Sequence, residues 1–513
     1  MATRLTYTSG ARTPEDDAAF EAALQAARDG RSEPLEHVVA GATSTDGPLF
    51  EREDPSRAGQ VASRAHEAPA ALVDEAVGRA RAAQREWRAL PVADRCAALR
   101  RAGAAIQERI LELAAVVTLE TGKTRTESIA EVQEAVELIE TYCAQIEAHD
   151  GFEIELGRLS EDERNRSVLR PFGAFGVIGP FNFPVALVTG MSAGALVAGN
   201  TVVIKPSEHA PWSGALVGEA FAQAGLPAGV FNVVHGGERA GSALAQSAID
   251  GVVFTGSAEV GRGLTRRFQE GRFARPAITE MGGKNPAIVS DRADLDAAAE
   301  GIAASAFGFS GQKCSACSRA IVDEAVHDEL VERLAARAAE LVVGDPADAG
   351  VYTGPVIDQR AVARFTDAVQ RTRHDGAIAA GGARMDLGGH YLQPTVAIGL
   401  PAGHPLTRDE LFVPFVTVTS VGSFDEALAE ANAIDYGLTA GVFSEDDAEV
   451  ERFLDEIEAG VVYVNRRAGA TTGAWPGIQT FCGWKSSGST NKGGLGPYYV
   501  AQFMREQSRT IVG

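Results

Sequence analysis

Two cysteines three residues apart are the first residues in this sequence whose type and spacing suggest chemistry. Cys314 and Cys317 lie in the glycine- and serine-punctuated segment 308–319, between a helical pattern and an apolar run. In the inert interpretation each thiol fills a gap in a core, as most free cysteines do. The active interpretations are a redox pair, half of a zinc site, or a nucleophilic thiolate served by a base from elsewhere in the chain.

The other cysteines and the histidines argue against a zinc site. The chain has 5 cysteines, and neither a second Cys-x-x-Cys nor a His-x-x-x-His pair accompanies the first pair. A complete tetrahedral site needs such a second half, so no metal is expected. The choice between a nucleophile and a redox pair depends on the rest of the chain.

An amide and a carboxylate follow two apolar runs that have the pattern of strands. Asn182 stands between two prolines in the segment 179–184, and Glu280 precedes paired glycines. Asn182 could stabilise its own turn, or it could donate its amide hydrogens to a developing oxyanion. Glu280 could form a salt bridge where two domains meet, or it could act as a general base.

Three further segments carry residues that suit a nucleotide. Lys205 and Glu208 end a strand pattern, where they could bind ribose hydroxyls or form a solvated surface pair. The segment 254–261 opens a helix pattern, and the N–H groups at a helix start suit a phosphate. The segment 410–412 lies in a loop before another strand pattern, where its glutamate could also be an ordinary helix-end acid.

Taken together, a thiol, a carboxylate, an amide and a nucleotide-type sheet indicate oxidation through a covalent thioester. A thiolate adds to a carbonyl, and the tetrahedral oxyanion collapses by expelling hydride to a nicotinamide. Water activated by a carboxylate then releases an acid. The pattern therefore favours Cys314 as a nucleophile.

A parallel sheet would position these residues. From residue 172 onward, helical segments alternate with apolar β-rich runs, which fall at 174–178, 201–204, 230–234 and 251–255. Apolar strands separated by helices are typical of a parallel sheet covered on both faces, which binds ligands at the C-terminal strand ends. A second α/β region is predicted from about residue 285, with strands at 287–289, 320–322, 416–418 and 461–464.

The flanking segments have simpler patterns. A helix is predicted near 14–30, and 67–147 has a helical period throughout. Residues 151–171 alternate as a projecting polar hairpin, and 509–512 form a candidate edge strand. Elements of this kind are often used in contacts between subunits.

Length and composition exclude several classes of protein. A chain of 513 residues with 45% hydrophobic residues can form two or three globular domains with well-buried cores. No apolar run approaches the roughly 20 residues that span a bilayer, and the N-terminal residues lack a signal-peptide core. Five cysteines make no disulfide framework, so a cytoplasmic location is expected.

The net charge of −22 argues against nucleic acid and against an anionic membrane surface as partners. Only six of the 47 basic residues are lysine, a composition that favours salt adaptation over an ordinary acidic surface from a GC-rich genome. Four of the six, Lys205, Lys284, Lys313 and Lys492, lie in short motifs. Where lysine is otherwise avoided, this placement suggests sites that need a compact ammonium group, or a turn.

In their order and spacing, the motifs resemble the NAD(P)-dependent aldehyde dehydrogenase superfamily. The resemblance extends from about residue 60 to the end and rests on the segments 180–184, 205–208, 254–257, 280–286, 311–314 and 410–412. It implies an α/β fold and a homo-oligomer built on dimers. The implied domains are a Rossmann-type NAD-binding domain (1–150 and 172–284), an α/β catalytic domain (285–465) and a small β oligomerisation domain (151–171 and 488–513).

The resemblance also implies a role for each site residue. Cys314 would be the nucleophile and Glu280 the general base, while the Asn182 amide and the Cys314 backbone N–H would form the oxyanion hole. NAD is the expected cofactor, with weaker use of NADP. The implied cofactor contacts are Lys205, Ser207, Glu208, Gly256, Ser257, Met281, Gly282, Glu410 and Phe412.

Within the superfamily, the segment 311–319 resembles the 1-pyrroline-5-carboxylate dehydrogenase branch. Members of this branch oxidise L-glutamate γ-semialdehyde to L-glutamate in proline catabolism. The segments 131–135 and 492–495 resemble the branch's helix beside the substrate tunnel and its clasp for the amino-acid end. The implied substrate contacts are Glu134, Phe183, Ser315, Gly494, Leu495 and Phe503.

Two other functions stay open as alternatives. A dehydrogenase for another semialdehyde, such as succinic semialdehyde, would need an arginine anchor in place of a serine and glycine clasp. A catalytically silent structural homologue is opposed by the presence of Cys314, Glu280 and Asn182. A redox switch between Cys314 and Cys317 is compatible with catalysis.

Overall fold

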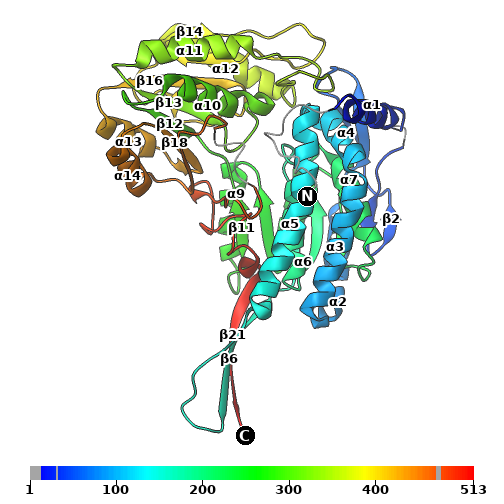
Figure 1. Cartoon of the computed structure of the whole chain (residues 1–513). Coiled ribbons are helices and arrows are strands. Elements are labelled where there is room, and N and C mark those ends of the chain that lie inside the picture. Colours follow the sequence, from blue (N-terminus) through cyan, green and yellow to red (C-terminus); the bar gives the residue numbers. More distant parts are fainter. Residues whose placement is uncertain (1–12, 31–32, 470–474) are drawn as a thin grey trace.

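Two seven-stranded sheets, each covered by helices, and a projecting β structure organise the molecule (Figure 1). The structure is a computed structural model, and it describes residues 13–30, 33–469 and 475–513. The helices are α1 (Pro14–Asp29), α2 (Ala70–Ala89), α3 (Val92–Glu108), α4 (Ile110–Thr121), α5 (Arg125–Ala148), α6 (Ala186–Val197), α7 (Pro211–Gln223), α8 (Glu238–Gln246), α9 (Ala258–Gln269), α10 (Leu295–Phe307), α11 (His327–Glu340), α12 (Gln359–Asp375), α13 (Phe424–Asn432) and α14 (Asp447–Glu456).

The first large sheet has the strand order β11-β10-β7-β8-β9-β1-β2. Its strands are β1 (His37–Val39), β2 (Ala42–Ser44), β7 (Ala174–Ile178), β8 (Thr201–Lys205), β9 (Phe231–Val233), β10 (Gly251–Thr255) and β11 (Ala277–Glu280). The five strands from β7 to β11 run parallel, and β1 joins β9 in the antiparallel direction. The predicted strands at 174–178 and 251–255 are confirmed residue for residue.

Helices cover both faces of this sheet, because its strands are apolar on both sides. Phe175 and Val177 of β7 belong to a core shared with α3, α5 and α6. Ala174 and Ile178 face the opposite way, into a core shared with α2, α8 and α9. This is the packing expected of continuous apolar strands. The helical pattern over 67–147 is confirmed as α2 to α5.

The second large sheet has the strand order β14-β15-β16-β13-β12-β18-β19. Its strands are β12 (Asn285–Val289), β13 (Cys317–Asp323), β14 (Ala377–Ala380), β15 (Thr395–Ile398), β16 (Phe415–Val421), β18 (Thr439–Phe443) and β19 (Val461–Val464). All neighbouring strands pair in parallel except β14, which lies antiparallel at one edge. The four strands predicted for this region are confirmed.

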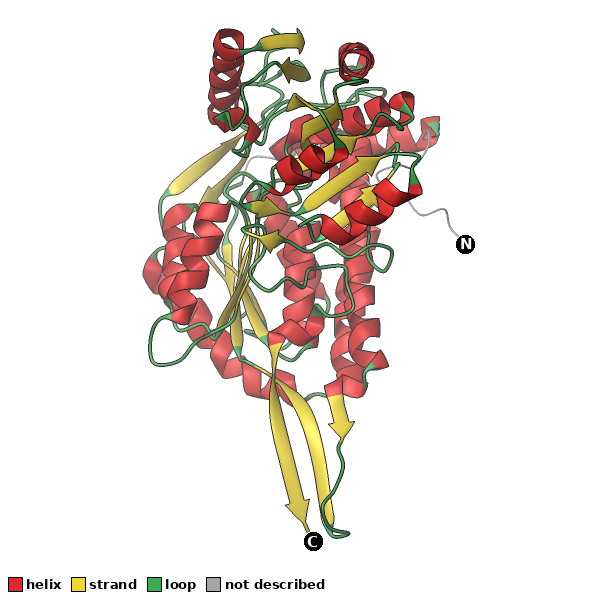
Figure 2. Cartoon of the chain, turned by 90° about the vertical axis from the view of Figure 1, so that its left-hand side faces the viewer, coloured by secondary structure: helices red, strands yellow, loops and turns green. Residues whose placement is uncertain are grey.

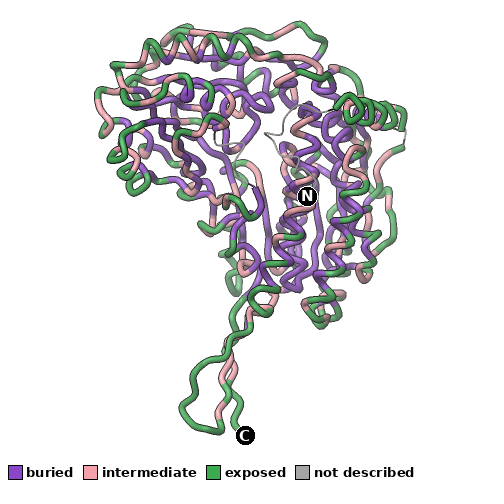
Figure 3. The backbone as a smooth tube through the Cα atoms, in the orientation of Figure 1, coloured by how far each residue is buried: buried purple, intermediate pink, exposed green. Residues whose placement is uncertain are grey.

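A β arm with two long strands and one short strand projects from the body (Figure 2). It consists of β21 (Met504–Val512) paired antiparallel along its whole length with β6 (Glu163–Pro171), and β5 (Glu153–Glu155) joins β6 on the other side. The arm is mostly exposed, in contrast to the buried strands of the two large sheets (Figure 3). The predicted hairpin and edge strand are therefore confirmed.

The smaller strands complete the described structure. They are β3 (Leu49–Glu53) with β4 (Val61–His66), and β17 (Tyr436–Gly437) with β20 (Trp484–Lys485). The helix predicted near 14–30 is confirmed as α1, but β1 to β3 were not predicted from the polar N-terminal sequence. Among the described residues, no helix combines the length and apolar content needed to cross a membrane.

Candidate active site

The loop that carries Cys314 is held in an unusual backbone conformation. After α10, a short 3-10 turn places Phe309, Ser310 and Gly311 at positive φ angles of 49°, 52° and 68°. The Ser310 N–H donates to the Thr353 hydroxyl oxygen at 2.7 Å. A β-carbon on Gly311 would lie 2.3 Å from the Val413 carbonyl oxygen, which explains the glycine. Consecutive non-glycine residues at positive φ are costly, and such strain is concentrated at functional sites.

The two cysteines of this loop lie in different surroundings. Cys314 lines a cavity, and its carbonyl oxygen accepts a hydrogen bond of 2.7 Å from the Asn285 amide. Cys317 starts β13 and is buried in the core of the second sheet. Burial, together with the charges of Glu410 and Glu280, raises the pKa of the Cys314 thiol to about 12. The resting thiol therefore holds its proton until a substrate, a cofactor or a base changes its surroundings.

Glu280 ends β11 and lines the same cavity as Cys314. Its Oε2 accepts a hydrogen bond of 3.1 Å from the Gly483 N–H. Burial raises the pKa of this carboxyl group well above its usual value, and the hydrogen bond only partly opposes the effect. A carboxylate with a raised pKa is a stronger base than an exposed one.

Asn182 lies in the loop between β7 and α6. Its side-chain nitrogen donates a hydrogen bond of 3.1 Å to the carbonyl oxygen of Gln312, two residues before the nucleophile. An amide nitrogen carries two hydrogens, so this bond leaves one N–H for another acceptor. The neighbouring Phe183 contributes to the wall of the Cys314 cavity.

This cavity has a volume of about 100 Å³ and combines one thiol, two carboxyl groups and several aromatic rings. The predicted residues in its wall are Cys314, Glu280, Glu134, Phe183, Ser315, Gly494 and Leu495. The wall residues that the sequence did not suggest are Leu138, Tyr142, Leu187, Gly190, Met191, Thr255, Phe481 and Tyr499. Leu138 and Tyr142 follow Glu134 on α5 at helical spacing, which is a signal that could have found them.

Phe503 is the one predicted substrate residue that the structure does not place in the cavity wall. Its ring is fully buried and packs edge-to-face on Tyr499, with the ring centroids 5.2 Å apart. Tyr499 in turn stacks on Tyr142 at 4.9 Å, and both tyrosines line the cavity. Phe503 therefore supports the aromatic wall from behind, because the ring of Tyr499, four residues earlier, takes the position at the cavity.

The turn around Gly494 closes one side of the cavity. Leu495 has a positive φ of 66°, and its N–H donates to the Tyr142 hydroxyl oxygen at 3.3 Å. A β-carbon on Gly494 would lie 3.5 Å from that same hydroxyl, in ordinary van der Waals contact. A side chain at Gly494 would therefore extend beside Tyr142 without displacing the backbone.

The predicted ribose-binding residues lie at the C-terminal end of β8. The buried Lys205 ammonium donates to the carbonyl oxygens of Pro206 and Gly236, at 2.8 and 2.9 Å. The Glu208 carboxylate lies 3.9 Å away and is half exposed. Ser207 is buried between them, and its hydroxyl accepts from the His209 N–H. A carboxylate beside a fixed ammonium suits the hydroxyl groups of a ribose.

The predicted phosphate-binding residues lie at the start of α9. Ser257 caps this helix, and its hydroxyl accepts from the Val260 N–H at 3.4 Å. Gly256 precedes the cap, where a β-carbon would lie 2.5 Å from the Phe254 ring. Met281 is buried under the same helix, close to Gly261. The free N–H groups of a helix start favour an anion.

Glu410 lies next to the glycine pair that follows Glu280. Its Oε1 accepts the Gly283 N–H at 3.0 Å, and a β-carbon on Gly282 would lie 2.0 Å from Oε2. Burial raises the pKa of Glu410 to about 7. Phe412, at a positive φ of 57°, packs edge-to-face on Phe181. The carboxylate, the ammonium and the helix start together form a donor and acceptor set that fits a dinucleotide.

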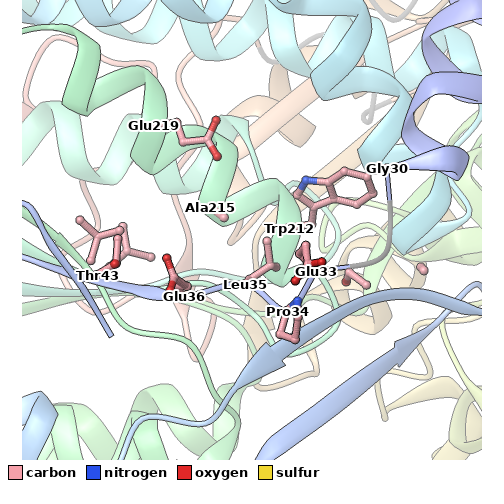
Figure 4. Close-up of a pocket in the computed structure, with 13 residues that line it drawn as sticks. Gly30, Glu33, Pro34, Leu35, Glu36, Thr43, Trp212, Ala215 and Glu219 are labelled. Carbon is pink, nitrogen blue, oxygen red and sulfur yellow. The ribbon is translucent and has the colours of Figure 1, made fainter. Parts of the chain in front are cut away.

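A larger cavity lies elsewhere and contains none of the predicted site residues. It has a volume of about 360 Å³ and lies between α7 and the chain around Glu33 to Glu36 (Figure 4). Its wall includes Trp212 and Glu219, and Glu219 is paired with Arg109 outside it. Cavity size alone therefore does not locate the chemistry. The described part of the chain contains no group of three or more His, Cys, Asp or Glu side chains placed to hold a metal ion.

Comparison of the sequence with models of known protein families assigns the chain to one family. A sequence model of the aldehyde dehydrogenase family matches residues 42–508. The chain belongs to the aldehyde dehydrogenase family.

Several relatives carry a more specific name. The chain is 36% identical over 502 residues to a 1-pyrroline-5-carboxylate dehydrogenase of Bacillus cytotoxicus, covering 96% of this chain and 95% of that protein. It is similar to a structure of 1-pyrroline-5-carboxylate dehydrogenase from Thermus with bound NAD, with a TM-score of 0.94 and 34% identity over 100% of this chain and 99% of that one.

It is also similar to proline utilization A from Bdellovibrio bacteriovorus, with a TM-score of 0.93 and 32% identity. That match covers 97% of this chain and 52% of that protein, so the chain spans about half the length of that relative.

Proposed function

We propose that this aldehyde dehydrogenase oxidises L-glutamate γ-semialdehyde, formed from 1-pyrroline-5-carboxylate, to L-glutamate with NAD. The single observation that carries the proposal is that Cys314, Glu280, Ser315 and the Gly494 turn line one cavity. That cavity joins a nucleophile and a base to neutral donors for a carboxylate. The names of the relatives from Bacillus and Thermus support the same substrate.

The protein side of the reaction follows from the positions of three groups. The Cys314 thiolate adds to the aldehyde carbon, and the free N–H of Asn182 stabilises the resulting oxyanion. NAD held by Lys205, Glu208 and the start of α9 would supply the hydride acceptor that conversion of the adduct to a thioester requires. Glu280 then takes a proton from water, which attacks the thioester and releases the acid and the Cys314 thiol.

The far end of the substrate carries an ammonium and a carboxylate. Ser315 offers a hydroxyl, and the turn at Gly494 offers backbone N–H groups, which together can hold a carboxylate without a cationic side chain. Glu134, in the same cavity wall, offers a negative partner for the ammonium. Phe183, Tyr142 and Tyr499 form the apolar wall beside the chain of methylene groups.

The cofactor set and the assembly belong to the same proposal. Lys205, Ser207 and Glu208 would hold the adenosine ribose, Gly256, Ser257 and Met281 the pyrophosphate side, and Gly282, Glu410 and Phe412 the nicotinamide half. The domains would be those expected from the sequence.

The exposed apolar residues of the projecting arm support a homo-oligomer built on dimers; they are Ile154, Leu156, Leu159, Ile511 and Val512. Five free thiols are compatible with a cytoplasmic location.

Product analysis tests the proposal. The purified protein is incubated with 1-pyrroline-5-carboxylate and NAD, and both NADH and L-glutamate are quantified. We expect the two products in equal amounts, with no turnover by the Cys314→Ala variant. Two results would contradict the substrate assignment. One is that 1-pyrroline-5-carboxylate yields NADH but no glutamate. The other is that 1-pyrroline-5-carboxylate yields no NADH although the same enzyme preparation oxidises propanal.

A further inference from the structure

A buried ion pair lies behind the active site, outside the cavity wall. Lys123 and Glu131 are both fully inaccessible to solvent, and the lysine Nζ donates directly to Glu131 Oε2. No sequence motif includes Lys123, and in the segment 131–135 the resemblance gives a role only to Glu134. Lysine and glutamate are almost never fully buried unless paired, so this pair calls for an explanation.

The Lys123 ammonium contacts both of the loops that make up the reaction centre. It donates to the backbone carbonyl oxygen of Asn182, in the oxyanion loop. It also lies 3.7 Å from the centroid of the Phe183 ring and 4.8 Å from that of Phe309, which is in the strained turn before Cys314. One cation therefore joins the loop of the amide to the loop of the nucleophile.

Glu131 holds the other end of the oxyanion loop. Its Oε1 accepts the N–H of Val185 at 2.8 Å and the N–H of Ala186 at 3.3 Å, where α6 begins. The carboxylate thus satisfies two of the free N–H groups at the start of the helix. The oxyanion loop is therefore held at two points, at the Asn182 carbonyl oxygen by Lys123 and at the N–H groups of Val185 and Ala186 by Glu131.

The position of Lys123 is itself fixed by the chain. It follows Gly122, which ends α4 at a positive φ of 74° and whose β-carbon would lie 2.6 Å from Pro355. Two residues later α5 begins, and this helix carries Glu131. The ammonium group therefore projects from a rigid turn between two packed helices.

Stability alone does not account for the pair. Replacing a buried ion pair by neutral groups of similar volume is often neutral or stabilising, because both charges had to leave water. The chain uses only six lysines, and Lys123 is one of the four that are buried, together with Lys205, Lys284 and Lys313. The other three lie in segments already linked to the cofactor site or to the nucleophile.

We propose that Lys123 and Glu131 are positioning residues that hold the Asn182 amide in place for oxyanion stabilisation at Cys314. The inference rests on the proposed thioester chemistry, but it does not depend on which aldehyde is the natural substrate. It predicts that the pair acts on the chemical step with every aldehyde alike.

The test uses a double variant, Lys123→Met with Glu131→Gln, which removes both charges and keeps the volume. The glutamine oxygen can still accept the N–H groups at the start of α6, so the fold is expected to survive. We expect kcat for both propanal and glutamate semialdehyde to fall by about 10- to 100-fold, because displacing a reacting group by about 1 Å can cost about 100-fold. The Kd of NAD is expected to stay within twofold.

A mutant cycle with Asn182→Ala separates an effect of the ion pair on the position of the Asn182 amide from a general disturbance of the fold. If the pair acts through Asn182, adding the double variant to Asn182→Ala lowers kcat by less than about twofold further, since the amide is already absent. Arg125→Met is the matched control: it removes a buried cation two residues after Lys123, at the start of α5, whose partners are the Ala347 carbonyl and the carboxylates of Asp17 and Glu21 of α1. It should leave kcat within twofold.

Three results would overturn the inference. The first is a folded double variant with wild-type kcat, and the second is a loss that multiplies with that of Asn182→Ala. The third is an equal loss in Arg125→Met. Because propanal serves as the substrate of the cycle, an enzyme that fails to use glutamate semialdehyde still reports on the pair. Failure of the substrate assignment and failure of this inference are therefore distinguishable.

Discussion

Burial and neighbouring carboxylates act in the same direction on Cys314. Both disfavour the thiolate, which explains why the pKa of the thiol rises to about 12. The Cys314 thiol is thus protonated in the free protein, and its ionisation depends on groups that approach it when substrate and cofactor bind. Cys317 is no substitute, because it lies in the core of the second sheet.

The first prediction concerns Cys314→Ala. We expect this variant to lose aldehyde oxidation entirely while still binding NAD, because the cofactor contacts lie on other elements. Turnover is measured as NADH formation, and binding is measured by calorimetry with NAD. Substantial residual oxidation would show that Cys314 is not the nucleophile.

The second prediction concerns the base. Glu280→Gln should keep the hydride step and slow the release of acid, so that a burst of NADH precedes a slow steady state. Burial raises the pKa of Glu280 and keeps it protonated at a pH where an exposed glutamate is ionised. In the wild type, the release rate should therefore increase with pH through this raised pKa, and the variant should lack that increase.

Rapid-mixing absorbance at several pH values measures both effects. A variant without a burst, although its acylation is intact, would show that another group activates the water. A wild-type release rate independent of pH would argue against Glu280 as the group that titrates.

At the scale of elements, the ends of strands and the start of one helix place most of the site. The sequence predicted β7 to β10 of the first large sheet and β12, β13, β16 and β19 of the second, because apolar β-rich runs between helices allow few other structures. It did not predict β1, β2, β14, β15 or β18, which are short or lie outside such runs. It also predicted where Cys314, Glu280 and Asn182 lie, since each follows such an element. The contacts of Lys123, just before α5, and of Tyr142, on α5, were not predictable, because Asn182 and Leu495 are distant from them in the sequence. The sequence likewise did not show that Tyr499 lines the cavity and that Phe503 packs behind it.

The third prediction concerns the turn at Gly494. Gly494→Val should raise KM for glutamate semialdehyde strongly and affect propanal far less, because only the longer substrate reaches this turn. The backbone tolerates the change, since a β-carbon would meet the Tyr142 hydroxyl at 3.5 Å. Steady-state kinetics with both aldehydes check it. An equal loss with both would show that the turn acts on the chemistry or on the fold.

The fourth prediction concerns the end of β8. A 2′-phosphate would lie close to the Glu208 carboxylate, and two such charges repel by roughly 1–4 kcal/mol in partly wet surroundings. This corresponds to a preference for NAD of about fivefold at the lower end of that range and about 1,000-fold at the upper end. Comparing kcat/KM with NAD and with NADP checks it, and equal values would show that Glu208 moves away. Glu208→Gln should reduce the preference.

At the scale of the whole molecule, charge is distributed unevenly between surface and interior. The chain has a net charge of −22, yet four of its six lysines are buried beside the reaction centre or the cofactor site. Most of the surface ion pairs use arginine, such as Arg100 with Glu140 and Glu147. Lysine scarcity was visible in the sequence, but its meaning for Lys123 required the structure, because no motif surrounds that residue.

The assignment of the thiol, the base and the Gly494 turn to one substrate site depends on which aldehyde the protein prefers. The decisive measurement is kcat/KM of the wild-type protein with NAD for glutamate γ-semialdehyde, succinic semialdehyde and propanal, under the same conditions. The account predicts the highest value for glutamate semialdehyde, because only this substrate fills both the cavity at Cys314 and the turn at Gly494. A higher value for succinic semialdehyde or propanal would contradict it, although the membership of the aldehyde dehydrogenase family would stand.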